Sequence, residues 1–273
     1  MKISIVTISY NQGKFLRSCI ESVLSERDKL AEIGVKLNHI IVDPGSTDGS
    51  RELIESYDDK VVKLFEKDNG PADGLNKGFS KADGDILGYL NSDDILLSGS
   101  LVKVAKFFKK HSKSTDVICG AANLIGPNNE VYRVLYSDRY SPLAYAYSGC
   151  VMIQPSSFFK RDIYLKTNGF NENNKTNWDG ELFVDMAQQG AKFKTITDVL
   201  SGYRVHDESI TGTMSTAEKM KEYRSRMYTK ITGNNISSYS KITEKYFKYS
   251  RKIKNWRDTL ERIKNGRSFG RAL

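Results

Sequence analysis

Short apolar runs with strand character alternate with helix-like patterns along the first 110 residues of the chain. Runs at residues 3–8, 39–42, 61–65 and 86–90 are each followed by polar, turn-forming residues and then by apolar residues at helical spacing. Strands that alternate with helices in this way pair in parallel through right-handed crossovers. The sequence therefore predicts an α/β fold, with a mostly parallel sheet flanked by helices.

The alternation of strand and helix patterns weakens in the second half of the chain. We expect strands at residues 117–121, 131–135 and 193–196, with a hairpin turn at 127–129. The aromatic segment 139–150 has the composition of a loop. A helical pattern that begins after Asn177 and ends at Gly190 predicts one further helix.

The composition is that of an ordinary soluble globular protein, with 39% hydrophobic and 27% charged residues among 273. This length allows one large α/β domain, alone or with a small appendage. No apolar run approaches the roughly 18–20 residues that span a bilayer, and the apolar part of the N-terminus is too short for a signal peptide. We therefore expect a cytoplasmic protein.

The net charge of +9 is concentrated in the C-terminal tail. Residues 216–273 contain 16 Lys and Arg against 5 Asp and Glu, a net charge of +11, whereas residues 1–215 have a net charge of −2. Two apolar stripes recur there at helical spacing, namely Met220, Tyr223, Met227 and Ile231, and then Tyr246, Tyr249, Ile253, Trp256 and Leu260. The tail is therefore expected to form basic amphipathic helices.

Three kinds of partner fit such helices. The first is an anionic membrane leaflet, with the aromatic residues at the interface, which would place the protein peripherally on the inner face of the cell membrane. The second is protein, because the stripes can pack on the rest of the chain or on another subunit of a homo-oligomer. The third, nucleic acid, is the least favoured, because no recognised motif accompanies the charge.

Acidic residues follow two of the predicted strands. Asp43 comes directly after the run at 39–42, and Asp93 and Asp94 follow the run at 86–90. Open α/β sheets bind ligands at the carboxyl ends of their strands, so these acids are expected at one edge. Two adjacent carboxylates repel each other and favour a hard divalent cation, which keeps open positions for phosphate oxygens. The pair predicts a metal–diphosphate site, with a solvated Asp-Asp turn as the alternative.

Five short motifs follow one another in order along residues 1–212. They are Thr7-x-Ser-Tyr-Asn11, Val42-Asp-x-Gly-Ser-Thr-Asp-Gly49, Asp68-x-Gly-x-x-Asp-x-Leu-Asn-Lys-Gly78, Gly84-Asp-Ile86 with Leu90-Asn-Ser-Asp-Asp94, and Tyr203-Arg-x-His206. Their order and spacing resemble those of family 2 glycosyltransferases, which have the Rossmann-like GT-A fold. The resemblance implies transfer of a sugar from a nucleotide diphosphate donor, usually with inversion at the anomeric carbon.

The resemblance also implies a division of the chain. A catalytic domain would span residues 1–212, with a nucleotide-binding half at 1–110 and an acceptor half at 111–212. The basic helical tail would be residues 213–273, outside the resemblance.

The resemblance, together with the chemistry of the side chains, implies roles for individual residues. The donor would be bound by Thr7, Ser9, Tyr10, Asn11, Asp43, Asp68, Lys77, Asn91, Ser92 and Asp93, and the metal by Asp93, Asp94 and His206. Asp43 matches the acid that holds the base and ribose of the donor. Asn91 stands where many relatives have Asp, and an amide is the weaker ligand, so the metal is placed on the two aspartates. Lys77 has a solvent-facing position as its alternative, and His206 an ordinary loop hydrogen bond.

The acceptor side of the site requires a general base, because the attacking hydroxyl must lose its proton. Asp179 resembles the catalytic acid of the family, and Glu181, two residues further on, is the alternate. For either residue, helix capping and compensation of the helix dipole are the simpler interpretation. Gln154, Pro155 and Ser156 resemble a family segment and are expected to line the acceptor side.

The leading hypothesis is an inverting glycosyltransferase that depends on Mn²⁺ or Mg²⁺. It would move a sugar, most simply a hexose, from a nucleotide-sugar to a glycan or lipid-linked acceptor in surface polysaccharide synthesis. A sugar-phosphate nucleotidyltransferase is a second hypothesis, against which the loop 9–13 lacks a basic residue. A non-catalytic binding protein on the same fold is a third, and the four carboxylates expected around one cleft argue against it.

Overall fold

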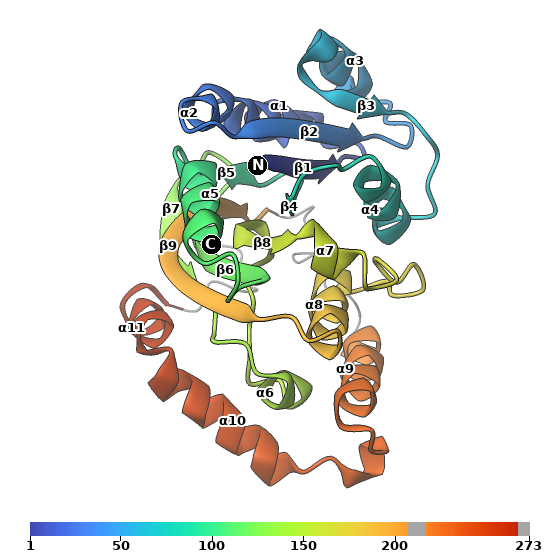
Figure 1. Cartoon of the computed structure of the whole chain (residues 1–273). Coiled ribbons are helices and arrows are strands. Elements are labelled where there is room, and N and C mark those ends of the chain that lie inside the picture. Colours follow the sequence, from blue (N-terminus) through green and yellow to red (C-terminus); the bar gives the residue numbers. More distant parts are fainter. Residues whose placement is uncertain (207–216, 267–273) are drawn as a thin grey trace.

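The computed structural model describes residues 1–206 and 217–266, and we refer to residues 1–206 as the body (Figure 1). Within the described residues, nine strands form one sheet in the order β3-β2-β1-β4-β8-β6-β9-β5, with β7 paired to β6. Helices cover both faces of this sheet (Figure 1), and three further α-helices and one short 3-10 helix follow the body.

The first half of the body contains the parallel strands. The strands are β1 (Lys2–Ile8), β2 (Lys36–Val42), β3 (Val62–Leu64) and β4 (Ile86–Asn91), and the helices are α1 (Gly13–Leu24), α2 (Arg27–Ala31), α3 (Ser50–Glu55), η1 (Asp58–Lys60) and α4 (Pro71–Ser80). β1 lies between β2 and β4, and all three pairings in this half are parallel. The predicted α/β sheet flanked by helices is therefore confirmed.

The second half of the body has mixed pairing. It contains β5 (Ile95–Leu96), α5 (Ser100–Lys110), β6 (Val117–Ile125), β7 (Val131–Tyr136), α6 (Pro142–Ala146), η2 (Gln154–Ser156), β8 (Ser157–Lys160), α7 (Arg161–Tyr164), α8 (Trp178–Gln188) and β9 (Phe193–Arg204). β8 is antiparallel to β4 and β6, whereas β9 runs parallel to β6. β6 and β7 form the predicted hairpin.

Two sequence predictions for this half were wrong in extent. The last strand is 12 residues long instead of ending near residue 196, because β6 pairs with it from Phe193 through to Arg204, with register shifts, and β5 pairs with it at Ser201 and Gly202. The segment 139–150 contains the short helix α6, whose start is stabilised by the Ser141 hydroxyl accepting a hydrogen bond from the Ala144 backbone N–H.

The core lies on both faces of the sheet because successive strand residues point to opposite sides. Ile5 packs with α1, α2 and α5, whereas Val6 packs with α4 and α8. α4 approaches β1 closely at Gly78, where an added Cβ would lie 2.4 Å from a methyl carbon of Val6. These helices hold the parallel strands in a fixed register, and so hold the loops at their carboxyl ends.

The tail is helical, as predicted, and its described part comprises α9 (Ala217–Thr232), η3 (Ile236–Ser238), α10 (Lys241–Lys254) and α11 (Trp256–Asn265). The first predicted stripe packs on the body, with Tyr223 and Met227 buried against Val184 of α8 and Tyr145 of α6. The second stripe remains exposed on α10 and α11. Among the described residues, no helix combines the length and apolar character needed to cross a membrane.

Candidate active site

The loops that follow β1 and β2 are joined at the edge of the sheet. The Asn11 backbone N–H donates to the Ser46 hydroxyl at 2.9 Å, and the Asn11 side-chain oxygen accepts from the Thr47 backbone N–H at 2.9 Å. Asn11 has φ of 51°, a left-handed conformation that Asn tolerates better than most residues. The two loops therefore form one rigid rim beside Asp43.

Asp43 is fully buried at this rim. Its Oδ1 accepts hydrogen bonds from the backbone N–H groups of Gly45 at 2.9 Å and Ser46 at 2.8 Å. Its Oδ2 has no hydrogen-bond partner in the described part of the chain. Because burying an unpaired carboxylate oxygen is costly, this atom is suited to accept a hydrogen bond from a ligand.

Asp68 lies near Asp43, within the loop 65–70 that leads from β3 into α4. Burial raises the pKa of Asp68, and the negative charges of Asp73 and Asp43 add to this effect. Gly74 makes room for this carboxylate, because an added Cβ would lie 2.7 Å from Asp68 Oδ2. The structure therefore brings Asp68 to the same rim as Asp43.

The second acidic corner follows β4 and contains Asp93 and Asp94. Asp94 is fully buried; its Oδ1 accepts from the Arg204 backbone N–H at 2.9 Å, and its Oδ2 has no partner among the described residues. Burial and the adjacent charge of Asp93 raise the pKa of Asp94 well above its ordinary value, although Arg204 and Asn91 oppose the rise. Asp93 is more open, and its Oδ2 lies 3.1 Å from His206 Nε2.

Long-range strand pairing builds this corner. β5 begins directly after Asp94 and pairs antiparallel with the end of β9, so that Ile95 lies opposite Gly202. The chain then places Arg204 and His206 against the two acids. A polar turn after β4 alone would leave the acids solvated, and the pairing with β9 is what buries Asp94.

Arg204 is a site residue that the sequence analysis missed. Its guanidinium is buried, donating from Nε to the Asp93 carbonyl at 2.6 Å, from Nη1 to the Gly126 carbonyl at 2.7 Å, and from Nη2 to Asn129 Oδ1 at 2.7 Å. Arg204 therefore fixes the backbone of the acidic corner. Its place inside the Tyr203-Arg-x-His206 motif was the available signal.

The side chains of the acidic corner fit a divalent cation. In the described ranges, no three His, Cys, Asp or Glu side chains form a complete ligand set. Mg²⁺ and Mn²⁺ at phosphate-binding sites need fewer protein ligands, because one or two carboxylates act together with waters and substrate phosphates. The unpartnered Asp94 Oδ2, beside Asp93 and its partner His206, meets that requirement.

Asp179 lies in the first turn of α8. Burial raises the pKa of Asp179, although the backbone N–H groups of Gly180 and of Asp179 itself stabilise the carboxylate. Its charge adds to the effect of burial in raising the pKa values of Tyr89 and Tyr145. Asp179 is therefore close to Tyr89 of β4, the strand that leads into the acidic corner.

Glu181 has a different environment, although it is only two residues away. It is buried, and it accepts hydrogen bonds from Arg226 at 2.9 Å and Lys230 at 3.2 Å, both on α9, and from Asn171 and Asn174. Burial opposes its ionisation, but Asn171 and Arg226 outweigh burial and lower the pKa of Glu181. Glu181 thus joins α8 to α9 with its oxygens fully engaged.

Two residues of the predicted donor set already have hydrogen-bond partners within the protein. Thr7 is fully buried, and its hydroxyl lies 3.0 Å from His39 Nε2. The Lys77 ammonium donates to Asp73 at 3.1 Å and to the Lys67 carbonyl at 2.5 Å, so it is already bound within its own helix and loop.

The other members of the donor set differ in exposure. Ser9 and Ser92 are buried, Asn91 is partly exposed, and Tyr10 is 61% exposed beside the rim. On the expected acceptor side, Ser156 is fully buried and donates to the Ala121 carbonyl at 2.6 Å.

The rest of that segment is also buried. Gln154 donates to the Tyr89 carbonyl at 2.8 Å, and Pro155 lies beside it in η2. The segment 154–156 therefore braces β4 and β6, with Gln154 nearest to the strand that ends in the acidic corner.

A parallel sheet with acids gathered at the carboxyl ends of its strands defines a class of α/β proteins that bind ligands at that edge. The family model described as glycosyl transferase family 2 matches residues 4–178. This match covers more than half of the chain, so the protein belongs to glycosyl transferase family 2. It is a glycosyltransferase, as the sequence resemblance implied.

Two curated relatives are similar over most of this chain. An uncharacterized glycosyltransferase of Nostoc sp. is 26% identical over 250 residues, covering 88% of this chain and 76% of the relative. The minor teichoic acid biosynthesis protein GgaB of Bacillus subtilis is 25% identical over 234 residues, covering 81% of this chain and 25% of that longer protein.

Solved structures share the fold. S. aureus TarS in complex with UDP-GlcNAc superposes with a TM-score of 0.67 at 17% identity, covering 96% of this chain and 74% of the TarS chain. The mannosyltransferase PcManGT of Pyrobaculum calidifontis, in complex with GDP-Man and Mn²⁺, has a TM-score of 0.62 at 15% identity, covering 96% of this chain and 73% of the other. These neighbours confirm the GT-A fold.

Proposed function

We propose that the protein moves a hexose from a nucleotide diphosphate sugar, with inversion, to a hydroxyl of a glycan or lipid-linked saccharide. We further propose that it depends on Mn²⁺ or Mg²⁺ and acts in the synthesis of a cell-surface polymer. One observation carries the proposal: the buried carboxylates of Asp43 and Asp94 each have one oxygen without a hydrogen-bond partner among the described residues, at the edge where the parallel strands end. Two such atoms provide one contact for a nucleoside and one for the cation that accompanies a diphosphate.

The comparisons support the finer parts of this proposal. TarS binds UDP-GlcNAc, and PcManGT binds GDP-Man with Mn²⁺. GgaB is named for teichoic acid biosynthesis, which is the basis for proposing a surface polymer.

The donor would be held by side chains whose orientation is already set by hydrogen bonds within the protein. Asp43 Oδ2 would accept a hydrogen bond from the base or ribose, and the rim built on Asn11 would keep the nucleoside in place. Because Oδ1 already accepts two backbone hydrogen bonds, the carboxylate is oriented before the donor arrives. This preorganisation reduces the free energy lost on binding.

The cation would be held by Asp93 and Asp94, with His206 beside Asp93. When bound, it neutralises charge on the departing nucleoside diphosphate. Arg204 holds the corner in shape through its bonds to the Asp93 carbonyl and to the loop 126–129.

Asp179 would be the general base. The acceptor oxygen forms a bond to the anomeric carbon as its proton passes to the Asp179 carboxylate, and the bond to the nucleoside diphosphate breaks on the opposite face. A base with a raised pKa is better matched to proton transfer near neutral pH. Glu181 is poorly suited, because cations and amides already occupy its oxygens.

A panel of nucleotide sugars tests the donor and metal parts together. Thermal shift and donor hydrolysis should be measured with UDP- and GDP-sugars, each with Mn²⁺, Mg²⁺ or a chelator. We expect at least one nucleotide sugar to raise the melting temperature with a metal and to lose this effect with the chelator. If no nucleotide diphosphate stabilises the protein under any of these conditions, the proposed function is wrong.

A further inference from the structure

Seven apolar side chains of α10 and α11 point into solvent. They are Ile242 at 82% exposed, Tyr246 at 62%, Tyr249 at 66%, Ile253 at 77%, Trp256 at 52%, Leu260 at 53% and Ile263 at 75%. Their spacing alternates between four and three residues, which places them along one face of each helix. We call this set the outer stripe. Scattered exposed apolar residues are common, but a continuous stripe marks a surface that binds something.

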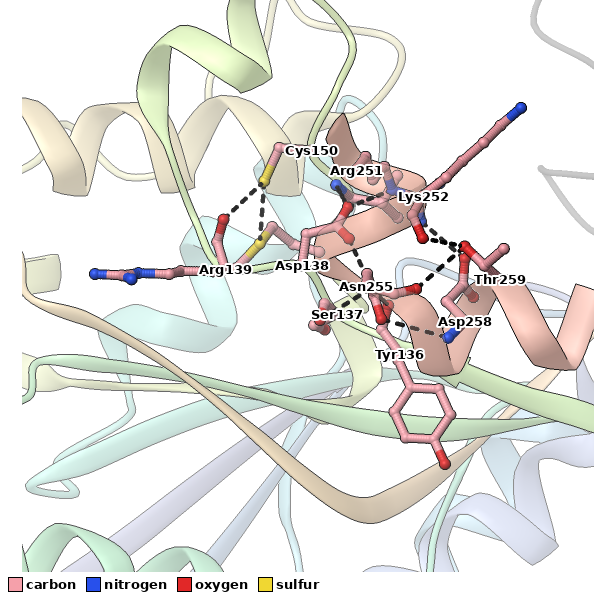
Figure 2. Close-up of polar contacts among 12 residues, drawn as sticks. Tyr136, Ser137, Asp138, Arg139, Cys150, Arg251, Lys252, Asn255, Asp258 and Thr259 are labelled. Carbon is pink, nitrogen blue, oxygen red and sulfur yellow. Dashed lines mark hydrogen bonds and ion pairs between the residues drawn. The ribbon is translucent and has the colours of Figure 1, made fainter. Parts of the chain in front are cut away.

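The opposite face of these helices is fixed to the body by polar contacts (Figure 2). The Arg251 Nε donates to Asp138 Oδ2 at 2.5 Å, and its Nη2 donates to Asp258 Oδ2 at 3.0 Å. Asn255, at the junction of the two helices, donates to Asp138 Oδ1 at 2.6 Å and to the Tyr136 carbonyl at 3.0 Å. The inward face thus carries these polar groups together with Phe247, which stacks on Tyr147 of the body, while the seven exposed apolar side chains face outward.

Further contacts hold α11 in this orientation. Asp258 is buried and also accepts from Arg262 at 2.7 Å, and it pairs with the buried Arg133 of β7 at 3.4 Å. Glu261 accepts from the Val134 backbone N–H at 3.1 Å. Rotation of the helices would break these ion pairs and leave buried charges unpaired, which is costly. The contacts with the body therefore keep the outer stripe directed outward.

The charged residues around the outer stripe are of one sign. Every exposed charged residue between positions 241 and 266 is basic, namely Lys241, Lys245, Lys248, Lys252, Lys254, Arg257 and Lys264. The three acids of this segment, Glu244, Asp258 and Glu261, are buried or half-buried and hydrogen-bonded. The surface therefore combines exposed aliphatic and aromatic side chains with flanking positive charge.

We propose that the outer stripe rests on the surface of an anionic lipid bilayer. Ile242, Ile253 and Ile263 would enter the boundary between headgroups and acyl chains, and the tyrosines and Trp256 would lie at headgroup level. The flanking lysines would contact lipid phosphates, each strengthening binding about fivefold.

A second copy of the chain fits this surface less well. An isologous contact between two outer stripes would bring the flanking lysines of both copies together, and like charges across an interface weaken it. Nucleic acid would satisfy the lysines but leave the exposed isoleucines in water.

Co-sedimentation of the full chain with vesicles tests the proposal. We expect binding to phosphatidylcholine vesicles that contain phosphatidylglycerol, weak binding to phosphatidylcholine alone, and loss of binding at high salt. Ile253→Asp should weaken binding at least about tenfold. The matched control is Leu165→Asp, because Leu165 is a 56% exposed apolar residue of the body outside the outer stripe.

A charge-reversal pair tests the electrostatic part. Lys245→Glu with Lys252→Glu should weaken binding by more than about tenfold, whereas Lys106→Glu with Lys110→Glu on α5 should leave it unchanged. No binding to either vesicle, or equal binding to both, would overturn the proposal. So would a stable dimer that Ile253→Asp dissociates while vesicles bind neither form. The assay contains no nucleotide, so its outcome is independent of the proposed transfer reaction.

Discussion

At the residue scale, the candidate site depends on two buried carboxylates. The sequence indicated both, because Asp43 directly follows one apolar run that predicts a strand and Asp94 comes four residues after another. It could not indicate that each would have one satisfied and one unpartnered oxygen. That distinction comes from loop geometry at Asp43 and from the pairing of β5 with β9 at Asp94, and neither is a local property of the sequence.

Asp94→Asn tests the metal assignment. The amide has nearly the size of the carboxylate and can still accept the Arg204 N–H bond, but it carries no charge for a cation. We expect the metal-dependent thermal shift by a nucleotide sugar to disappear while the ligand-free melting temperature changes little. Asp83→Asn, at an exposed acid paired with Lys2, should keep the shift. A full metal-dependent shift in Asp94→Asn would show that the cation is held elsewhere.

Asp179→Asn tests the assignment of the base. We expect kcat to fall by about 10²- to 10⁴-fold, with donor affinity measured by calorimetry unchanged, because a general base acts on the acceptor proton. In the parent enzyme, activity should be lost as the pH falls through a pKa above the ordinary value for Asp, because the base must be ionised. Near-normal turnover in Asp179→Asn would show that another group is the general base.

At the element scale, the parallel half of the sheet was predictable from the sequence, whereas the full length of β9 and the helix α6 in the second half of the body were not. β1 to β4 alternate with helices over short distances, so their local pattern was sufficient. β9 continues past residue 196 only because β6 and β5 lie beside it, and Asp198 and Gly202 give no strand signal. α6 was missed although Ser141-Pro142 is a typical N-cap followed by proline in the first turn.

Glu181→Gln tests the connection between α8 and α9. The carboxylate is buried against Arg226 and Lys230, so its neutralisation removes two charge-assisted hydrogen bonds. We expect a loss of about 1–3 kcal/mol in the free energy of unfolding, measured in urea. Glu222→Gln, on an exposed position of α9, should cost less than about 0.5 kcal/mol. If kcat instead fell strongly while the free energy of unfolding stayed near the parent value, Glu181 would take part in the reaction.

At the scale of the whole molecule, acid should destabilise the fold through His39. Burial lowers the pKa of His39 from 6.5 to about 3, with Arg27 adding to the effect. Between those values the unfolded chain binds one more proton than the folded chain, so stability falls as the pH drops from about 6.5 toward 3. The slope from this residue is at most about 1.4 kcal/mol per pH unit.

Urea unfolding at several pH values checks this expectation. His39→Gln can keep the contact with Thr7 and does not titrate, so stability should fall less steeply with acid than in the parent. His111→Gln, at the end of α5, is the matched control and should retain the parent slope. Equal slopes in all three proteins would show that His39 does not limit acid stability.

The shared position of Asp179 and Glu181 on one helical turn has a practical consequence. α9 supplies the cations that compensate Glu181, so a chain cut before α9 would leave that carboxylate, two residues from the proposed base, with the amides of Asn171 and Asn174 and without a compensating positive charge. We expect such a truncated enzyme to lose activity whether or not the outer stripe binds lipid. Point substitutions in the outer stripe, which leave the contacts with the body intact, are therefore needed to distinguish lipid binding by the C-terminal helices from their structural role.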